Sequence, residues 1–139
     1  MVASLLVGAM LVGTTPPTDV PRHIWDSSYE VFDNYADEYH LTMQSGVFDG
    51  PSGKETYYNL DMSGVVSIMR GLGFSEEEYP YWVREDGAKM LGDYVMVACE
   101  LNIRPRGTII ITSMGEAIVC DTGSFAYSNP YQIDIAVTW

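Results

Sequence analysis

The spacing of apolar and polar residues predicts one short helix in the middle of the chain. Apolar residues recur on one stripe between Val65 and Leu72, as expected of a helix that covers a core. Asp61 can cap the first turn, and a glycine at position 71 or 73 can end the last one. We therefore expect a helix from Met62 to about Leu72.

Most of the remaining chain has a pattern typical of short strands. Residues 93–99 are a nearly continuous apolar run, which indicates a strand buried on both faces. Turn signals separate the segments, above all at residues 49–53, 86–87 and 114–115. The expected strands are residues 41–48, 80–83, 93–99, 107–113, 116–121 and 132–139. About six strands with one helix predict a mainly β domain, a small closed or nearly closed β-barrel.

The first 40 residues lack this strand pattern, and we expect them to lie outside the barrel. Residues 1–13, MVASLLVGAMLVG, are apolar but shorter than the about 20 residues that span a membrane. They resemble the centre of a secretory signal or the end of a membrane anchor, and the alternative is a buried strand or helix. Residues 14–40 combine a proline-rich linker with a short amphipathic segment. The barrel is expected over residues 41–139.

Charge and length narrow the classes of function. The chain has 139 residues, which favours one folded domain, and a net charge of −12. A nucleic-acid backbone or an anionic membrane surface would be repelled by most of such a surface. We therefore expect no nucleic-acid partner, and contact with a membrane only through an N-terminal anchor.

The two cysteines and two histidines do not indicate a metal site. Cys99 and Cys120 are too few for a structural zinc site, and His23 and His40 have no supporting ligand pattern. Each cysteine precedes an acidic residue, so strand alternation places both thiols on the face opposite the acids. They are either a disulfide or two buried thiols, and we favour the thiols. No cofactor is expected.

Three acidic residues lie at or near strand ends and are the first candidates for chemistry. Strand alternation puts Glu100, Asp121 and Asp134 on faces with mainly small side chains, and Asp121, for example, shares its face with Val119. Clustered carboxylates cannot all ionise, so the pKa of one of them rises. A carboxyl that is protonated near neutral pH can donate a proton to a leaving oxygen, as glycosidic cleavage requires. The alternative is that each acid is an isolated, exposed strand end or turn cap.

The residues Asp121-Thr122-Gly123-Ser124 also match the active-site signature of pepsin-like aspartic proteases. Such a protease needs two carboxylates that share one proton, and this chain has a single loop of this kind. Only residues 125–139 follow the motif, which is too little chain to build the flap and the strand that buries the loop. A dimeric aspartic protease is therefore a minor alternative.

Three segments together resemble the three-aspartate (3D) domain. They are VMVACELNIRPRGTIII from Val95, GEAIVCDTG from Gly115 and QIDI from Gln132. The 3D domain is a double-psi β-barrel related to membrane-bound lytic transglycosylase A and to the stationary-phase survival proteins of spore-forming bacteria. The resemblance implies a six-stranded double-psi barrel with one or two short helices, in a protein of the bacterial cell envelope or the extracellular space.

The resemblance also implies an activity, the lytic cleavage of peptidoglycan between N-acetylmuramic acid and N-acetylglucosamine, which leaves a 1,6-anhydro sugar. One residue can serve as both acid and base, and by motif position it is Asp134. Asp121 matches the middle aspartate of the family and would hold Asp134 or the sugar. Glu100 stands where the family has its first aspartate and is one methylene longer. Residues 124–132 also differ from the family, so we expect a different groove wall.

The expected partner is a peptidoglycan glycan strand, bound by a monomer. Tyrosine rings can stack on sugar faces while their hydroxyls form hydrogen bonds. The main alternative is a barrel that binds cell-wall glycan without cutting it, as expansin-like proteins are thought to do. The residues expected to contact substrate are Thr122, Gly123, Tyr57, Tyr58, Tyr127 and Asn129.

Overall fold

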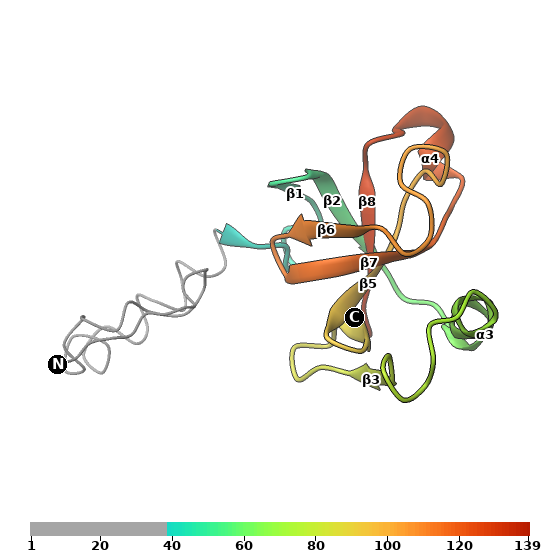
Figure 1. Ribbon diagram of the computed structural model, residues 1–139. Coiled ribbons are helices and arrows are strands. Elements are labelled where there is room, and N and C mark those ends of the chain that lie inside the picture. Colours follow the sequence, from blue (N-terminus) through green and yellow to red (C-terminus); the bar gives the residue numbers. More distant parts are fainter. Residues whose placement is uncertain (1–38) are drawn as a thin grey trace, which may run out of the picture. The chain divides into compact units, whose positions relative to one another are not determined.

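One sheet of eight short strands organises residues 39–139, the part of the chain that the computed structural model describes (Figure 1). These residues form one compact unit. The segment expected at residues 1–13, and residues 14–38 of the segment expected at 14–40, lie outside the described residues. The strands are β1 (Phe48–Gly50), β2 (Gly53–Tyr58), β3 (Tyr81–Val83), β4 (Lys89–Leu91), β5 (Tyr94–Ala98), β6 (Ile109–Thr112), β7 (Gly115–Asp121) and β8 (Ile133–Ala136), and the helices are α3 (Ser63–Gly71) and α4 (Phe125–Ser128).

Strand β5 lies at the centre of the sheet. β4 and β8 pair with it along one edge, both antiparallel, and β7 pairs with it in parallel along the other edge. The order β1-β2-β8-β5-β4-β3 forms the main path, and β6 pairs with β7 beside it. The prediction of a mainly β domain with short helices is confirmed. The sheet is not closed, so the six-stranded barrel is not confirmed.

Several expected elements have nearly the expected bounds, but the first expected strand is wrong. Helix α3 covers the predicted helix, and the Oδ1 of Asp61 accepts the Ser63 N–H at 3.0 Å, although Met62 occupies the N-cap position. Of the expected strand at residues 41–48, only Phe48 is in a strand. Thr42 and Ser45 instead bond to each other through side chains and backbone, which turns the chain.

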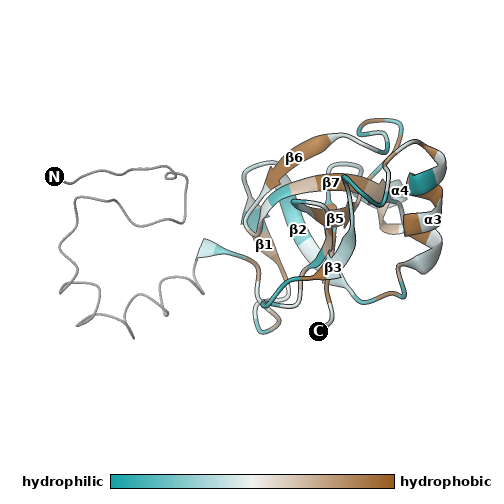
Figure 2. Cartoon of the chain, turned by 60° about the horizontal axis from the view of Figure 1, so that its bottom comes forward, coloured by the Kyte–Doolittle hydropathy of each residue, from teal (hydrophilic) through white to brown (hydrophobic). Residues whose placement is uncertain are grey.

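The core is divided into two apolar clusters. Helix α3 contributes Val65 and Met69 to the second cluster, and its N-cap residue Met62 packs there too. Figure 2 shows that β6 is strongly apolar, whereas part of β2 is hydrophilic. The first cluster contains Leu41, Ala88, Met90, Val95, Val97, Cys99, Met114, Ala117, Val119, Ile133, Ile135 and Val137, and the second contains Met62, Val65, Met69, Leu91, Met96, Ile118, Cys120 and Ala136. Alternate residues of β5, β7 and β8 thus pack into different clusters, as strand alternation requires.

No helix among the described residues is long and apolar enough to cross a membrane.

Candidate active site

Asp121 and Asp134 come together because both are register partners of Ala98 in β5. Asp121, the last residue of β7, pairs with Ala98 from one side, and Asp134 of β8 pairs with it from the other. Neighbouring strands are about 5 Å apart, so the two Cα atoms are separated by roughly 10 Å across a small side chain. The two carboxyl groups therefore lie on neighbouring sites of one sheet, both half-buried.

A β-bulge in β7 decides which way Asp121 faces. Val97 pairs with Val119, but the next residue of β5, Ala98, pairs with Asp121, so Cys120 is the extra residue. Cys120 packs in the second cluster, and the Asp121 side chain also turns to this side, where Tyr58 packs. The expectation from strict alternation, that Asp121 shares the face of Val119, is therefore wrong.

The Asp121 carboxylate accepts hydrogen bonds on both oxygens. The Tyr58 hydroxyl donates to Oδ2 at 2.8 Å, and the Thr122 backbone N–H donates to Oδ1 at 2.8 Å. Burial, the charge of Asp121 and this hydrogen bond, together with the nearby Asp134, raise the pKa of Tyr58 above its ordinary value. Tyr58 therefore remains a hydroxyl donor beside the aspartates, and its expected contact with substrate stays a prediction.

Asp134 is held by a short hydrogen-bonded chain. The Gln132 side-chain N–H donates to the Thr56 hydroxyl at 2.8 Å, and that hydroxyl donates to Oδ1 of Asp134 at 2.9 Å. Within residues 39–139, the Oδ2 of Asp134 has no hydrogen-bond partner. Burial raises the pKa of Asp134, the Thr56 hydrogen bond lowers it, and the charge of Asp121 raises it, with a net upward shift. The net shift therefore favours the protonated form of Asp134.

Glu100 does not join this pair. Strand β5 ends at Ala98, and the chain turns at once, with the Glu100 carbonyl accepting the N–H groups of Ile103 and Arg104. The Glu100 carboxylate folds back to accept the Asn102 N–H at 3.1 Å and lies 3.4 Å from the Asn102 side-chain nitrogen. No hydrogen bond joins Glu100 to either aspartate in the described part of the chain. Of the three acids, only Asp121 and Asp134 are register partners of Ala98, so the expected cluster of three is not confirmed.

Glu100 instead borders a cavity of about 500 Å³, which neither Asp121 nor Asp134 lines. Thr122 and Gly123, two residues predicted to bind substrate, line this cavity, and so does Tyr127 of α4. The Tyr127 side chain is 92% exposed, which leaves its ring available to a ligand. Thr122, which lines the cavity, directly follows Asp121 in the chain.

Two other predicted substrate contacts lie elsewhere. Tyr57 points to the opposite face of β2, where its hydroxyl donates to the Met43 carbonyl at 3.2 Å and its ring packs edge-on against Trp139, 4.6 Å between centroids. The structure does not bring it to the aspartates. Asn129 lines a smaller cavity of about 240 Å³, together with Lys54, Tyr131 and Gln132.

Thr56 and Gln132 belong to the site and were missed from sequence. Lys54, Thr56 and Tyr58 alternate along β2 and so share one face. This alternation of polar residues was a usable signal. It was obscured because Glu55, between Lys54 and Thr56, is acidic, although its side chain is fully buried.

The two cysteines are free and buried, in agreement with the interpretation that we favoured. The Cys120 thiol donates to the Val97 carbonyl at 3.6 Å, and burial is the main cause that raises its pKa to about 12. Among residues 39–139, no group of three or more His, Cys, Asp or Glu side chains could hold a metal ion.

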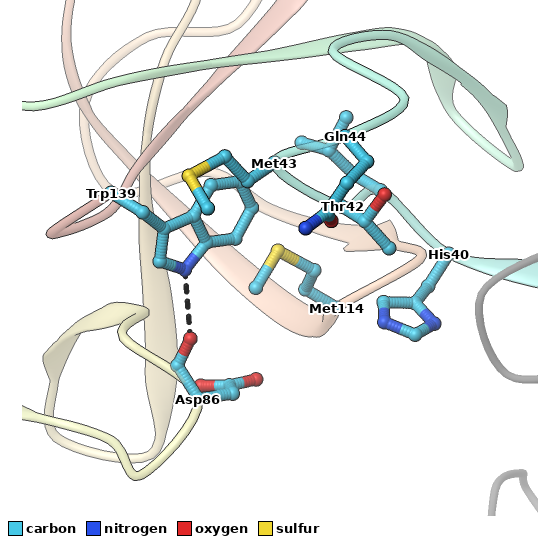
Figure 3. A pocket seen from close by; sticks show the side chains of 8 residues that line it. His40, Thr42, Met43, Gln44, Asp86, Met114 and Trp139 are labelled. Atoms are coloured by element: carbon cyan, nitrogen blue, oxygen red, sulfur yellow. Dashed lines mark hydrogen bonds between the residues drawn. The ribbon is translucent and has the colours of Figure 1, made fainter. Parts of the chain in front are cut away.

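A further cavity, of about 250 Å³, is separate from the predicted site residues (Figure 3). Met43, Met114 and Trp139 give it an apolar wall, and His40 and Asp86 are at its margin. The Trp139 indole N–H donates to the Asp86 carbonyl at 2.8 Å, which fixes the end of the chain described here. None of the acidic residues of the candidate site lines it.

Comparisons with known proteins returned no match for the chain among protein-family models, curated proteins or solved structures.

Proposed function

We propose that the protein cleaves the glycan strands of peptidoglycan as a lytic transglycosylase, with Asp134 as its single acid and base. The observation that carries this proposal is that Asp134 and Asp121 are both register partners of Ala98, one on each side of β5. Burial and the neighbouring charge raise the pKa of Asp134, which favours a proton on its carboxyl group.

In this reaction Asp134 donates one proton and then takes one back. The protonated Asp134 donates to the glycosidic oxygen as the bond to the anomeric carbon of N-acetylmuramic acid breaks. The resulting Asp134 carboxylate then takes the proton from the sugar's own C6 hydroxyl, whose oxygen attacks the anomeric carbon and closes the 1,6-anhydro ring. No water is consumed, so no second carboxylate is needed to activate one.

The remaining residues of the site support these steps. Oδ2 of Asp134 is the oxygen that can face the substrate, because Thr56 occupies Oδ1. Asp121 accepts hydrogen bonds from Tyr58 and Thr122, which hold its carboxyl group in place. Its negative charge favours the positive character that develops at the anomeric carbon in the transition state.

The proposal also concerns the fold of the protein and its location. We interpret the open sheet as a variant of the double-psi barrel that the 3D-domain resemblance implies. In its support, the three resembling segments run along or beside adjacent strands, β5, β7 and β8. The proposed location is the bacterial cell envelope or the extracellular space, where a monomer meets peptidoglycan. No cofactor takes part in the proposed reaction.

Digestion of purified peptidoglycan tests the proposal. Mass spectrometry should detect anhydro-muropeptides after incubation with the wild-type protein. Asp134→Asn should lower their yield at least about 100-fold, the usual contribution of a general acid or base. The matched control is Asp49→Asn, an exposed aspartate of the edge strand β1, which should leave the yield unchanged.

Other outcomes identify the alternatives. Retention of the wild-type protein on insoluble wall, with no anhydro product, would replace the enzyme by a glycan-binding protein. Peptide cleavage blocked by a statine-type inhibitor would replace it by a dimeric aspartic protease.

A further inference from the structure

Strand β3 has an unpaired edge. It ends the main path of strands and, within residues 39–139, it pairs only with β4 (Figure 1). On the β4 side, the Arg84 N–H donates to the Ala88 carbonyl at 2.8 Å. Backbone groups of an antiparallel strand point to alternate sides, so the N–H and C=O groups of Tyr81 and Val83 point away from β4. These four groups can form the hydrogen bonds of one more strand.

Side chains on both faces of β3 are exposed. Tyr81, Trp82 and Val83 are 39%, 43% and 46% exposed, although alternate side chains of a strand point to opposite faces. The Trp82 indole N–H donates to the Gly92 carbonyl at 2.8 Å, which fixes the ring. An exposed indole can hold a lysine or arginine cation over its face. An added strand would therefore find aromatic contacts as well as backbone partners.

The surroundings of β3 are acidic. Seven acidic and three basic residues lie between residues 60 and 94, so negative charge is in excess here. The three glutamates at positions 76–78, together with Glu85 and Asp93, are exposed. None of them forms an ion pair within the described part of the chain. Their charges are therefore available to a partner.

The three basic residues of this region have partners of their own. Arg84 forms a salt bridge with Asp86 at 2.8 Å. Arg70 donates to two backbone carbonyls, and the buried Lys89 donates to a carbonyl and to an asparagine side chain. An added strand with positive side chains is therefore favoured at this edge, and one with negative side chains is disfavoured.

A second copy of this chain fits the edge poorly. Two antiparallel β3 strands centred on Trp82 would bring residues 76–78 of one copy close to Glu85 of the other. Like charges that face each other destabilise a pair of strands. The favoured occupant is therefore a segment of a different protein.

We propose that the outer edge of β3 binds an extended, lysine- or arginine-bearing segment of a partner protein as an additional strand. Backbone hydrogen bonds to Tyr81 and Val83 hold this segment. Its positive side chains meet the indole face of Trp82 and the carboxylates of Glu85 and of residues 76–78. The inference does not depend on the proposed function, because β3 contributes none of the residues of the candidate active site.

NMR titration of the nitrogen-15-labelled full chain tests the proposal. The probe is a peptide of about ten residues that alternates lysine and threonine, and the comparison peptide has glutamate in place of lysine. When the free basic peptide is at about ten times its Kd, amide–water exchange at Tyr81 and Val83 should slow about tenfold. The amides of Ile109 and Ile111 point outward from β6, which pairs only with β7, and should not change. The acidic peptide should protect none of these amides.

Two variants separate backbone pairing from charge. Val83→Pro removes an outward N–H and retains the pairing with β4, so it should weaken binding of the basic peptide about fivefold or more. Glu85→Gln should weaken it about two- to fivefold, as expected for the loss of one exposed ion pair. The matched controls Ile111→Pro on β6 and Glu116→Gln on β7 should leave the affinity unchanged. Circular dichroism of each variant checks that the fold is retained.

Several outcomes would overturn the proposal. They are unchanged exchange at Tyr81 and Val83 with the basic peptide, equal binding of the two peptides, and equal losses in Glu85→Gln and Glu116→Gln. Slow exchange at the same two amides without peptide, together with a dimer in sedimentation, would replace the partner by a second copy of the chain. If Val83→Pro does not fold, the exchange measurements and the two peptides decide.

Discussion

Asp121 and Asp134 face the same side of the sheet because both are paired with Ala98, one from each neighbouring strand of β5. The small side chain of Ala98 leaves space between the two carboxyl groups. The bulge at Cys120 turns Asp121 toward this space, and Thr56 holds Asp134 from the other side. Burial of Asp134 and the charge of Asp121 across Ala98 raise the pKa of Asp134, and the Thr56 hydrogen bond opposes this shift.

The Thr56 hydroxyl should lower the pKa of Asp134. In Thr56→Val, Asp134 loses a donor to its charged form, so its pKa should rise further. The buried Gln132 amide also loses its acceptor, and the free energy of unfolding should fall by about 1–3 kcal/mol. Carbon-13 NMR of the aspartate carboxyls and urea unfolding measure the two effects.

Thr56→Ser is the matched control, since it keeps the hydroxyl and removes only a methyl group. It should restore the pKa of Asp134 to near the wild-type value. An unchanged pKa in Thr56→Val would show that the hydrogen bond does not act on Asp134.

The buried Glu55 should make stability depend on pH. Burial raises the pKa of this carboxyl, although two hydrogen bonds from Ser113 and the charge of His40 oppose the shift. The folded state therefore holds the proton more tightly than the unfolded state. The protonated Glu55 contributes fully to the free energy of unfolding below the pKa that glutamate has in the unfolded state, about 4.3. This contribution is lost as the pH rises through the raised pKa of Glu55 in the folded state.

Unfolding by denaturant between about pH 4 and pH 8 measures this dependence. The free energy of unfolding should decline less with rising pH in Glu55→Gln than in the wild type. Asp134 contributes in the same direction in both proteins, so the difference isolates Glu55, and His40→Gln controls for the imidazole. Identical slopes in the wild type and Glu55→Gln would contradict the prediction.

Ser113 should be important for stability, because it links three parts of the fold. Its N–H and hydroxyl donate to the Glu55 carboxylate at 2.8 and 2.5 Å, and its oxygen accepts the Leu41 N–H at 2.9 Å. Ser113→Ala removes the hydroxyl, so the buried Glu55 carboxyl group keeps only the backbone N–H of residue 113, and the Leu41 N–H loses its acceptor. We expect a loss of about 2–3 kcal/mol in urea unfolding.

Ser45→Ala is the comparison for Ser113→Ala, because Ser45 is exposed and its hydrogen bonds are local. It should cost less than about 1 kcal/mol. Equal losses in the two variants would remove the special role of Ser113.

Both thiols should be unreactive in the folded protein. Cys99 and Cys120 have no exposed surface, and burial raises the pKa of each, so the reactive thiolate is scarce. Labelling with iodoacetamide at about pH 8 should be negligible in the native state and complete for both cysteines in denaturant. Rapid native labelling, or a mass two hydrogens lower from a disulfide, would contradict this.

Local patterns in the sequence were sufficient to predict helix α3 and strand β5. The apolar stripe from Val65 and the continuous apolar run over residues 93–99 each depend on near neighbours in the chain. The hairpin of β6 and β7 was also predictable, because Gly115 has a φ of +116° at the turn that joins them.

The geometry of the site depended on pairing between distant segments. The bulge at Cys120 exists only relative to β5, so alternation within β7 placed Asp121 on the wrong face. The same limit applies to Glu100, whose carboxylate is captured by Asn102 once β5 ends at Ala98. Strand β2 was missed because it contains Glu55, a buried acid that no rule of apolar patterning anticipates.

The pKa of Asp134, measured by carbon-13 NMR titration in the wild type and in Asp121→Asn, is the most direct test of the central claim. The site described here predicts a value above the ordinary aspartate value of about 3.9 in the wild type, and a lower value once the charge of Asp121 is removed. Asp49→Asn should leave it unchanged. An ordinary value for Asp134 that does not respond to Asp121→Asn would contradict the claim that these two residues form an acid pair.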